Sequence, residues 1–96
     1  MRVRFTSTAE VELEEALQFY QSAKEGLGAE FLMEVQAATN LIESFPLAWL
    51  ALSSRTRRCR THRFPYALFY QVRNDEILIV SVMDLRRDPK QWEEYL

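Results

Sequence analysis

The chain has 96 residues, of which 48% are hydrophobic and 27% charged, and its net charge is -2. This length accommodates one domain over residues 1–96 with a single core, and one cysteine with one histidine cannot complete a zinc site, so we expect neither a metal nor a cofactor. The sequence has no apolar run of about 18 residues and no signal-peptide core near its N-terminus, which argues against a membrane span and predicts a cytoplasmic protein.

The first half of the chain predicts a short strand followed by two helices. Residues 3–5 are β-prone, and Ser7 and Glu10 have the spacing of a capping box, so we expect a helix to begin there and to end in the KEGLG turn of residues 24–28. A second helix should follow and end before Pro46. Apolar residues spaced by three and four positions give each helix one buried stripe: Leu13, Ala16, Leu17 and Tyr20 in the first, and Phe31, Val35, Ala38, Ile42 and Phe45 in the second.

The second half predicts a sheet and a final helix. Three β-prone segments follow one another at residues 57–63, 66–72 and 77–83. A turn at residues 74–75 joins the last two, so these strands should form a meander. Asp88 followed by Pro89 is typical of a helix start, and the short helix would carry Trp92 and Tyr95. The predicted class is therefore α+β, in the order β-α-α-β-β-β-α, with the helical hairpin packed on the sheet.

The first of these strands alternates between apolar and basic residues. Cys59 and Thr61 fall on one face, whereas Arg58, Arg60 and His62 fall on the other. We expect Cys59 to be a small core residue and the three basic side chains to point outward.

Charge is divided unevenly along the chain. Residues 1–54 hold three basic and eight acidic residues, a net charge of -5, whereas residues 55–96 hold nine basic and six acidic residues, a net charge of +3. Residues 55–63 alone contain five arginines and the histidine. This basic run is open to four interpretations: a nucleic-acid-binding strand, an RNA-cleaving site, a binding surface for an acidic protein, or a solvated strand that avoids edge-to-edge aggregation.

These features together resemble the RelE/ParE superfamily, the toxin halves of bacterial type II toxin-antitoxin pairs. The resemblance covers nearly the whole chain and is carried by the helical hairpin, by the EFLMEV and ESFP stretches of the second helix, and by RRCRTHRFPYALFYQV followed by SVMDLRRDPKQW. It implies a small curved antiparallel sheet with the hairpin on one face, and an antitoxin protein as partner.

The superfamily has members with different targets. Those similar to RelE cleave mRNA in the ribosomal A site, and those similar to ParE poison DNA gyrase. The ribonuclease branch implies several cationic residues and a C-terminal tyrosine, but this chain has Ala67 where an arginine is implied, Trp92 nearest the tyrosine, and Asp84 where many relatives have histidine. An indole cannot exchange a proton as a phenol does, and an aspartate repels phosphate. The residues that fit catalysis are Arg58, Arg60 and Arg86.

We therefore expect a non-enzymatic, ParE-like toxin that inhibits DNA gyrase and forms a hetero-oligomer with its antitoxin. One alternative is a ribosome-dependent mRNA endoribonuclease, and another is a degenerate module that binds an antitoxin without being toxic. The residues expected to bind partners are Arg58, Arg60, His62, Tyr66, Arg86, Arg87 and Trp92. For Arg86 and Arg87, ion pairs with Asp84, Asp88 or glutamates of the helices that hold the C-terminal segment are a competing interpretation.

Overall fold

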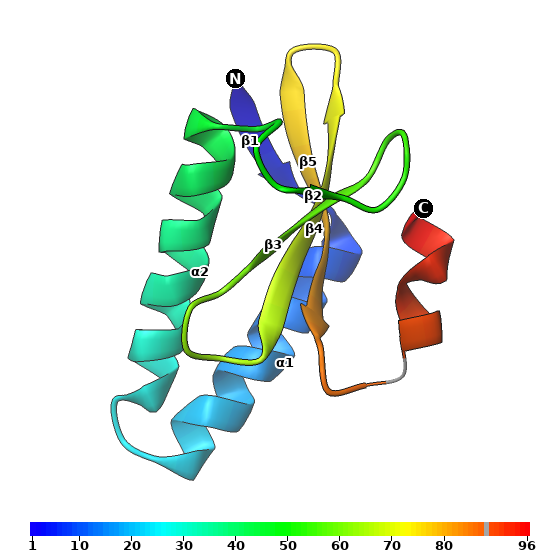
Figure 1. Cartoon of the computed structure of the whole chain (residues 1–96). Coiled ribbons are helices and arrows are strands. Elements are labelled where there is room, and N and C mark those ends of the chain that lie inside the picture. Colours follow the sequence, from blue (N-terminus) through cyan, green and yellow to red (C-terminus); the bar gives the residue numbers. More distant parts are fainter. Residues whose placement is uncertain (88) are drawn as a thin grey trace.

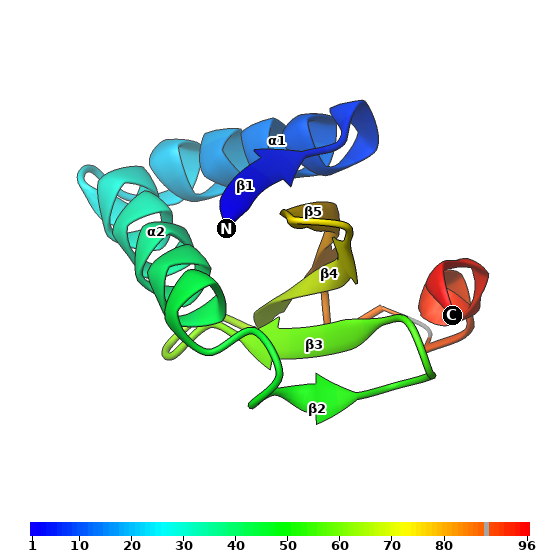
Figure 2. The ribbon, with the colours of Figure 1, turned by 90° about the horizontal axis from the view of Figure 1, so that it is seen from above.

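Two helices cover one face of a five-stranded sheet in the computed structural model, and a short 3-10 helix lies on the other face (Figure 1, Figure 2). The structure describes residues 1–87 and 89–96, except for the side chains of residues 89, 91 and 92. The predicted helix cap at Asp88 and the side chain of Trp92 therefore lie outside the described residues. The elements are β1 (Arg2–Phe5), α1 (Ser7–Ala23), α2 (Leu27–Ser44), β2 (Leu50–Ala51), β3 (Arg57–Arg60), β4 (Tyr66–Arg73), β5 (Glu76–Asp84) and the 3-10 helix η1 (Pro89–Tyr95).

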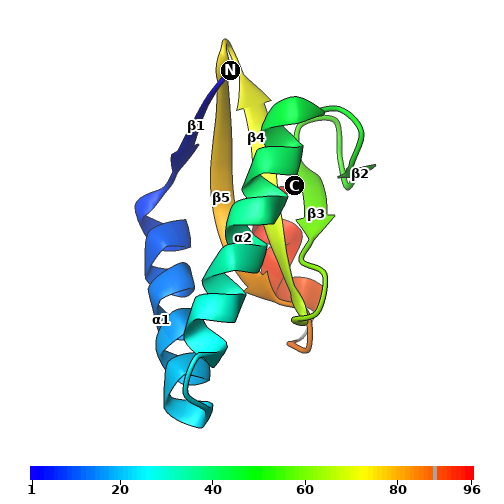
Figure 3. The same ribbon diagram turned by 90° about the vertical axis from the view of Figure 1, so that its left-hand side faces the viewer.

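The sheet has the strand order β1-β5-β4-β3-β2. Strands β3, β4 and β5 form the predicted antiparallel meander, and β2, which the sequence did not reveal, pairs antiparallel with β3. The sheet is mixed, however, because β1 pairs in parallel with β5. A parallel pair needs a crossover connection, and here the helical hairpin carries the chain from the β1 edge to the β2 edge (Figure 3). The predicted α+β class with a hairpin on the sheet is confirmed.

The helix ends differ from the prediction at two residues. Thr6, one residue before the predicted Ser7, caps α1, because its extended backbone lets the hydroxyl accept a hydrogen bond from the Ala9 N–H at 3.1 Å. At the other end of the hairpin, α2 ends at Ser44 and Phe45 is its C-cap residue. Phe45 therefore lies beyond the helical stripe and is 60% exposed, where a core position was predicted.

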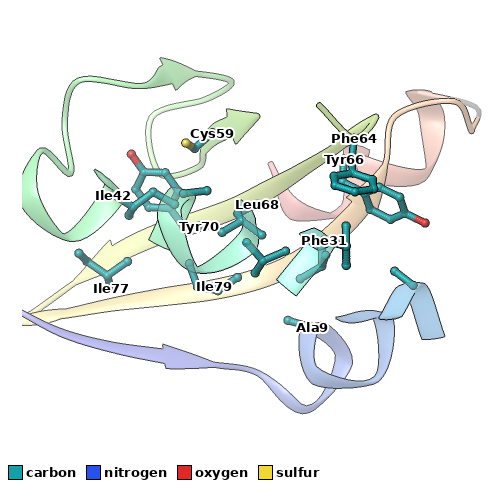
Figure 4. Close-up of a cluster of buried hydrophobic side chains, with 14 of the residues drawn as sticks. Ala9, Phe31, Ile42, Cys59, Phe64, Tyr66, Leu68, Tyr70, Ile77 and Ile79 are labelled. Atoms are coloured by element: carbon teal, nitrogen blue, oxygen red, sulfur yellow. The ribbon is translucent and has the colours of Figure 1, made fainter. Parts of the chain in front are cut away.

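The main core lies between the helices and the sheet. Tyr20 and the predicted α2 residues Phe31, Val35, Ala38 and Ile42 pack on inward side chains of β4 and β5, and Cys59 is buried there as expected (Figure 4). A second, smaller cluster on the opposite face consists of Ala67, Phe69, Leu78, Val80 and Met83. Both faces of the central strands are thus covered.

The C-terminal segment helps to cover this second cluster. The Tyr95 ring packs against Phe69 with centroids 6.3 Å apart. The Tyr95 carbonyl accepts hydrogen bonds from Thr56 Oγ1 and from Gln71 Nε2, the latter at 3.3 Å. Ala67, in the same cluster, is fully buried.

Candidate functional site

A groove of about 760 Å³ runs between α2 and the loop that joins β3 to β4. Its α2 side is partly apolar, and Met33 and Leu41 there are 72% and 45% exposed. Its loop side carries Arg60, His62 and Arg63. We call this feature the helix groove; its lining residues are Glu30, Met33, Glu34, Ala37, Ala38, Leu41, Arg60, Thr61, His62 and Arg63.

One arginine fixes the loop side of the helix groove to the helix. The backbone N–H of Arg63 donates to Glu34 Oε1 at 2.8 Å, and its Nε donates to Glu34 Oε2 at 2.9 Å. Partial burial opposes ionisation of Glu34, but the hydrogen bonds and charge of Arg63 prevail and lower the pKa of this carboxyl. Arg63 is thus held against the helix, whereas the side chains of Arg60 and His62 have no ion pair with a described residue.

Arg58 and Arg60 lie on the outward face of β3. Arg58 stands opposite Phe69 and Arg60 opposite Ala67 on β4, so both share the face that carries the second cluster. Within the described part of the chain, neither guanidinium has a carboxylate within ion-pair distance. Between them Cys59 faces the core, where burial raises the pKa of its thiol to about 11. The thiol is therefore unreactive at neutral pH.

A second cavity, of about 320 Å³, lies between α1 and the C-terminal end of β5. Asp84 accepts hydrogen bonds there from the N–H, Nε and Nη2 of Arg86 at 2.9, 3.0 and 2.9 Å, and this arginine lowers the pKa of Asp84. Arg87 has no ion pair with any described residue. We call this cavity the charged pocket; it is lined by Glu12, Glu15, Ala16, Phe19, Tyr66, Val82, Met83, Asp84, Arg86 and Arg87.

Glu12 connects the charged pocket to the sheet. Strand β5 continues past the end of β1, and Glu12 Oε1 accepts hydrogen bonds from Val82 N at 3.0 Å and Ser81 Oγ at 2.9 Å. Burial raises the pKa of Glu12, although both bonds oppose that effect. With three carboxylates against two arginines, the pocket is poorly suited to bind phosphate.

The structure divides the predicted partner-binding residues between these features. The helix groove contains Arg60 and His62, and the charged pocket contains Tyr66, Arg86 and Arg87, with the Tyr66 side chain largely buried. Of the three catalytic candidates, Arg60 and Arg86 therefore line different cavities, and Arg58 lines neither.

The apolar side of the helix groove was not identified from the sequence. The available signal was the four-residue spacing of Met33, Ala37 and Leu41, which forms a second stripe beside the core stripe of α2.

Among the described residues, no cluster of three or more histidine, cysteine, aspartate or glutamate side chains is arranged to hold a metal ion. None of the described helices combines the length and apolarity needed to cross a membrane.

Comparisons with known proteins identify similar chains. The model of the family described as the ParE toxin of the type II toxin-antitoxin system parDE matches residues 3–89. The fold is similar to a chain of a chromosomal ParDE toxin-antitoxin system from P. aeruginosa, with a TM-score of 0.64 and 16% identity over 88% of this chain and 96% of that chain. At this identity the structural likeness concerns the fold. A comparison with curated protein sequences gives no match.

Proposed function

The chain belongs to the ParE family of toxins in type II toxin-antitoxin systems, and from this premise we propose that it inhibits DNA gyrase and is neutralised by a cognate antitoxin that occupies the helix groove. The resemblance of the sequence to the RelE/ParE superfamily is confirmed on its ParE branch. The toxin and its antitoxin would form a cytoplasmic hetero-oligomer.

The composition of the helix groove is the observation that supports it as the antitoxin-binding site. Met33 and Leu41 leave apolar surface exposed on α2, and Arg60 provides a cation without a carboxylate partner among the described residues. An amphipathic segment with apolar anchors and acidic flanking residues would complement both. Such a segment can be disordered alone and become ordered along the toxin.

Gyrase inhibition without RNA cleavage is supported by the arrangement of the cationic residues. RNA cleavage needs convergent groups that move protons and stabilise the charge on phosphate. Arg60 and Arg86 line separate cavities, and the charge of Arg86 is balanced by Asp84 at 2.9 Å. Ala67, where the ribonuclease branch implies an arginine, is fully buried, so an arginine side chain there would have to displace its neighbours. The ParE branch therefore accounts for the residues better.

The proposal is tested by adding purified toxin to DNA gyrase, ATP and relaxed plasmid, and separately to a translating extract. We expect a block of supercoiling or an accumulation of cleaved DNA in the first assay, and intact mRNA in the second. Addition of the purified product of the adjacent antitoxin gene should restore supercoiling. Efficient cutting of mRNA at the A site with gyrase unaffected would refute the assignment in favour of the ribonuclease, and inactivity in both assays would leave the degenerate binding module.

A further inference from the structure

One edge of the sheet is formed by a segment without charge. Residues 44–54, between Glu43 and Arg55, contain eleven residues and none of them is acidic or basic. This uncharged edge segment includes β2, the last strand in the sheet order (Figure 2). Proteins protect exposed edge strands with charges or by keeping them short, because an open edge can pair with another chain; β2 has only two residues but no charge. The opposite edge has this protection, since β1 carries Arg2 and Arg4.

The uncharged edge segment is nevertheless held firmly in place. The buried Tyr70 hydroxyl donates to the Pro46 carbonyl at 2.5 Å, and Arg57 Nη1 donates to the Trp49 carbonyl at 2.8 Å. These bonds fix the backbone while large side chains face solvent. The exposed fractions are 60% for Phe45, 68% for Leu47 and 56% for Leu50, and Leu41 at the end of α2 is 45% exposed.

The exposed apolar side chains come from both sides of the free edge. Leu50 stands opposite Arg58 and so shares its face of the sheet, whereas Leu41 and Phe45 belong to the end of α2, on the helical face. If a fully exposed side chain of this size presents about 200 Å², the four together expose roughly 450 Å² per copy. This total lies within the roughly 300–600 Å² that is typical of the largest apolar patch on a monomer, and such patches often bind other proteins.

We propose that β2 pairs antiparallel with β2 of a second copy of this chain across a two-fold axis, and that Phe45, Leu47 and Leu50 pack at the seam. A two-fold interface brings a surface against itself, so a charge near its centre meets its own copy and repels it. The uncharged edge segment avoids this repulsion, whereas the arginines of the β1 edge would not. An acidic antitoxin segment or a phosphate backbone finds no cation within this segment, which favours a second copy as its partner.

The size of the patch sets the strength of the association. Two copies would bury roughly 900 Å² of apolar side-chain surface, whereas stable complexes typically bury about 1,200–2,000 Å² of total surface, polar and apolar together. The dimer should therefore be weak and should depend on concentration. The interface borders the helix groove, because Leu41 belongs to both, whereas Phe45, Leu47 and Leu50 lie outside the groove lining.

Sedimentation velocity of the purified toxin over a series of micromolar concentrations tests the proposal. We expect a monomer at the low end and a dimer at the high end, with the dimer lost in Leu47→Glu and in Leu50→Lys. Met33→Glu is the matched control, since it places a charge on an exposed apolar residue in the helix groove, and it should leave the dimer intact. All three positions are exposed, and circular dichroism verifies folding. A monomer throughout, or equal loss of the dimer in Leu47→Glu and Met33→Glu, would refute the interface.

Cross-linking tests the pairing of the strands directly. Ala51→Cys places a thiol beside the proposed axis, and a mild oxidant should convert this variant to a covalent dimer at concentrations where the wild type associates. Arg73→Cys, near the β4–β5 turn, is an exposed control that should cross-link far more slowly. The native Cys59 is buried and does not compete. Equal rates of cross-linking for the two variants would contradict the proposed geometry.

Discussion

Arg63 and Glu34 lie 29 residues apart and are joined through both oxygens of one carboxylate, at 2.8 Å from the arginine backbone N–H and 2.9 Å from its Nε. This contact ties the β3–β4 loop to the middle of α2, and both residues line the helix groove. It also removes one arginine from the positive charge offered to a partner. Arg60, on the same side of the helix groove, keeps its charge available.

Glu34→Gln should loosen this attachment. The amide can still accept one hydrogen bond, but it does not balance the guanidinium, so we expect a lower urea midpoint and a severalfold weaker complex with the antitoxin. The pKa of Glu34 is lowered in the folded state, so its contribution to stability is present above the pKa of an unfolded glutamate, about 4.3, and is lost as pH falls through the folded value. The difference in midpoint between wild type and variant should therefore shrink from pH 7 to acidic pH. Glu43→Gln, an exposed change at the end of α2, is the matched control and should leave the urea midpoint at pH 7 close to that of the wild type.

Tyr70→Phe should destabilise the fold at the start of the uncharged edge segment. The change leaves the Pro46 carbonyl without its hydroxyl donor, which typically costs about 1 kcal/mol in the free energy of unfolding. Burial raises the pKa of Tyr70 to about 12, so its contribution is complete below the unfolded tyrosine pKa of about 10 and is lost as pH rises through the folded value. Denaturant unfolding at pH 7 and between pH 10 and 12 measures both effects. An alkaline profile identical in wild type and variant would contradict the role given to Tyr70.

Two substitutions of Glu12 should have opposite outcomes. Burial raises the pKa of Glu12, so its effect on stability is most favourable below the unfolded pKa and declines as pH rises through the folded one. Glu12→Gln keeps an oxygen that can accept from Ser81 and Val82 while removing the charge, and at pH 7 it should be as stable as wild type or more so. Glu12→Ala leaves both donors without a partner and should lose about 1–3 kcal/mol. Thermal and urea unfolding of the pair would decide, and equal losses would argue against the hydrogen-bonding role.

The elements that the sequence predicted are those set by local spacing. The stripe from Phe31 to Ile42 follows from the helical spacing of three to four residues, and the inward position of Cys59 follows from the two-residue alternation of a strand. Both are buried in the structure. Phe45 satisfies the same helical spacing but falls on the C-cap residue, where the chain leaves the helix, so the pattern extended one position too far.

The features that were missed depend on contacts between distant parts of the chain. The parallel pairing of β1 with β5 joins residues such as Arg4 and Leu78, and no local pattern encodes it. The two-residue strand β2 is too short for a periodic signal, and the contact of Arg63 with Glu34 forms only once loop and helix meet. Residue type alone placed Arg60 and Arg86 in one candidate site, whereas the fold places them in two cavities.

Charge reversal at three arginines should separate the helix groove from the rest of the basic half of the chain. Arg60 lines the helix groove. Arg58 lies two residues earlier on the same outward face of β3, and Arg73 is the last residue of β4, next to the β4–β5 turn. Each change to glutamate alters the net charge equally, so long-range attraction to an acidic antitoxin should fall by a similar amount in all three variants. Only a residue in close contact should also change the dissociation rate, because close charge pairs chiefly affect the lifetime of a complex. We therefore expect Arg60→Glu to accelerate dissociation most, by about tenfold or more, Arg58→Glu less, and Arg73→Glu little.

Binding of the three toxin variants to surface-immobilised antitoxin, compared at low and high salt, would measure these rates. Equal dissociation rates for all three variants would mean that only net charge matters. That result would contradict the proposal that the antitoxin binds in the helix groove.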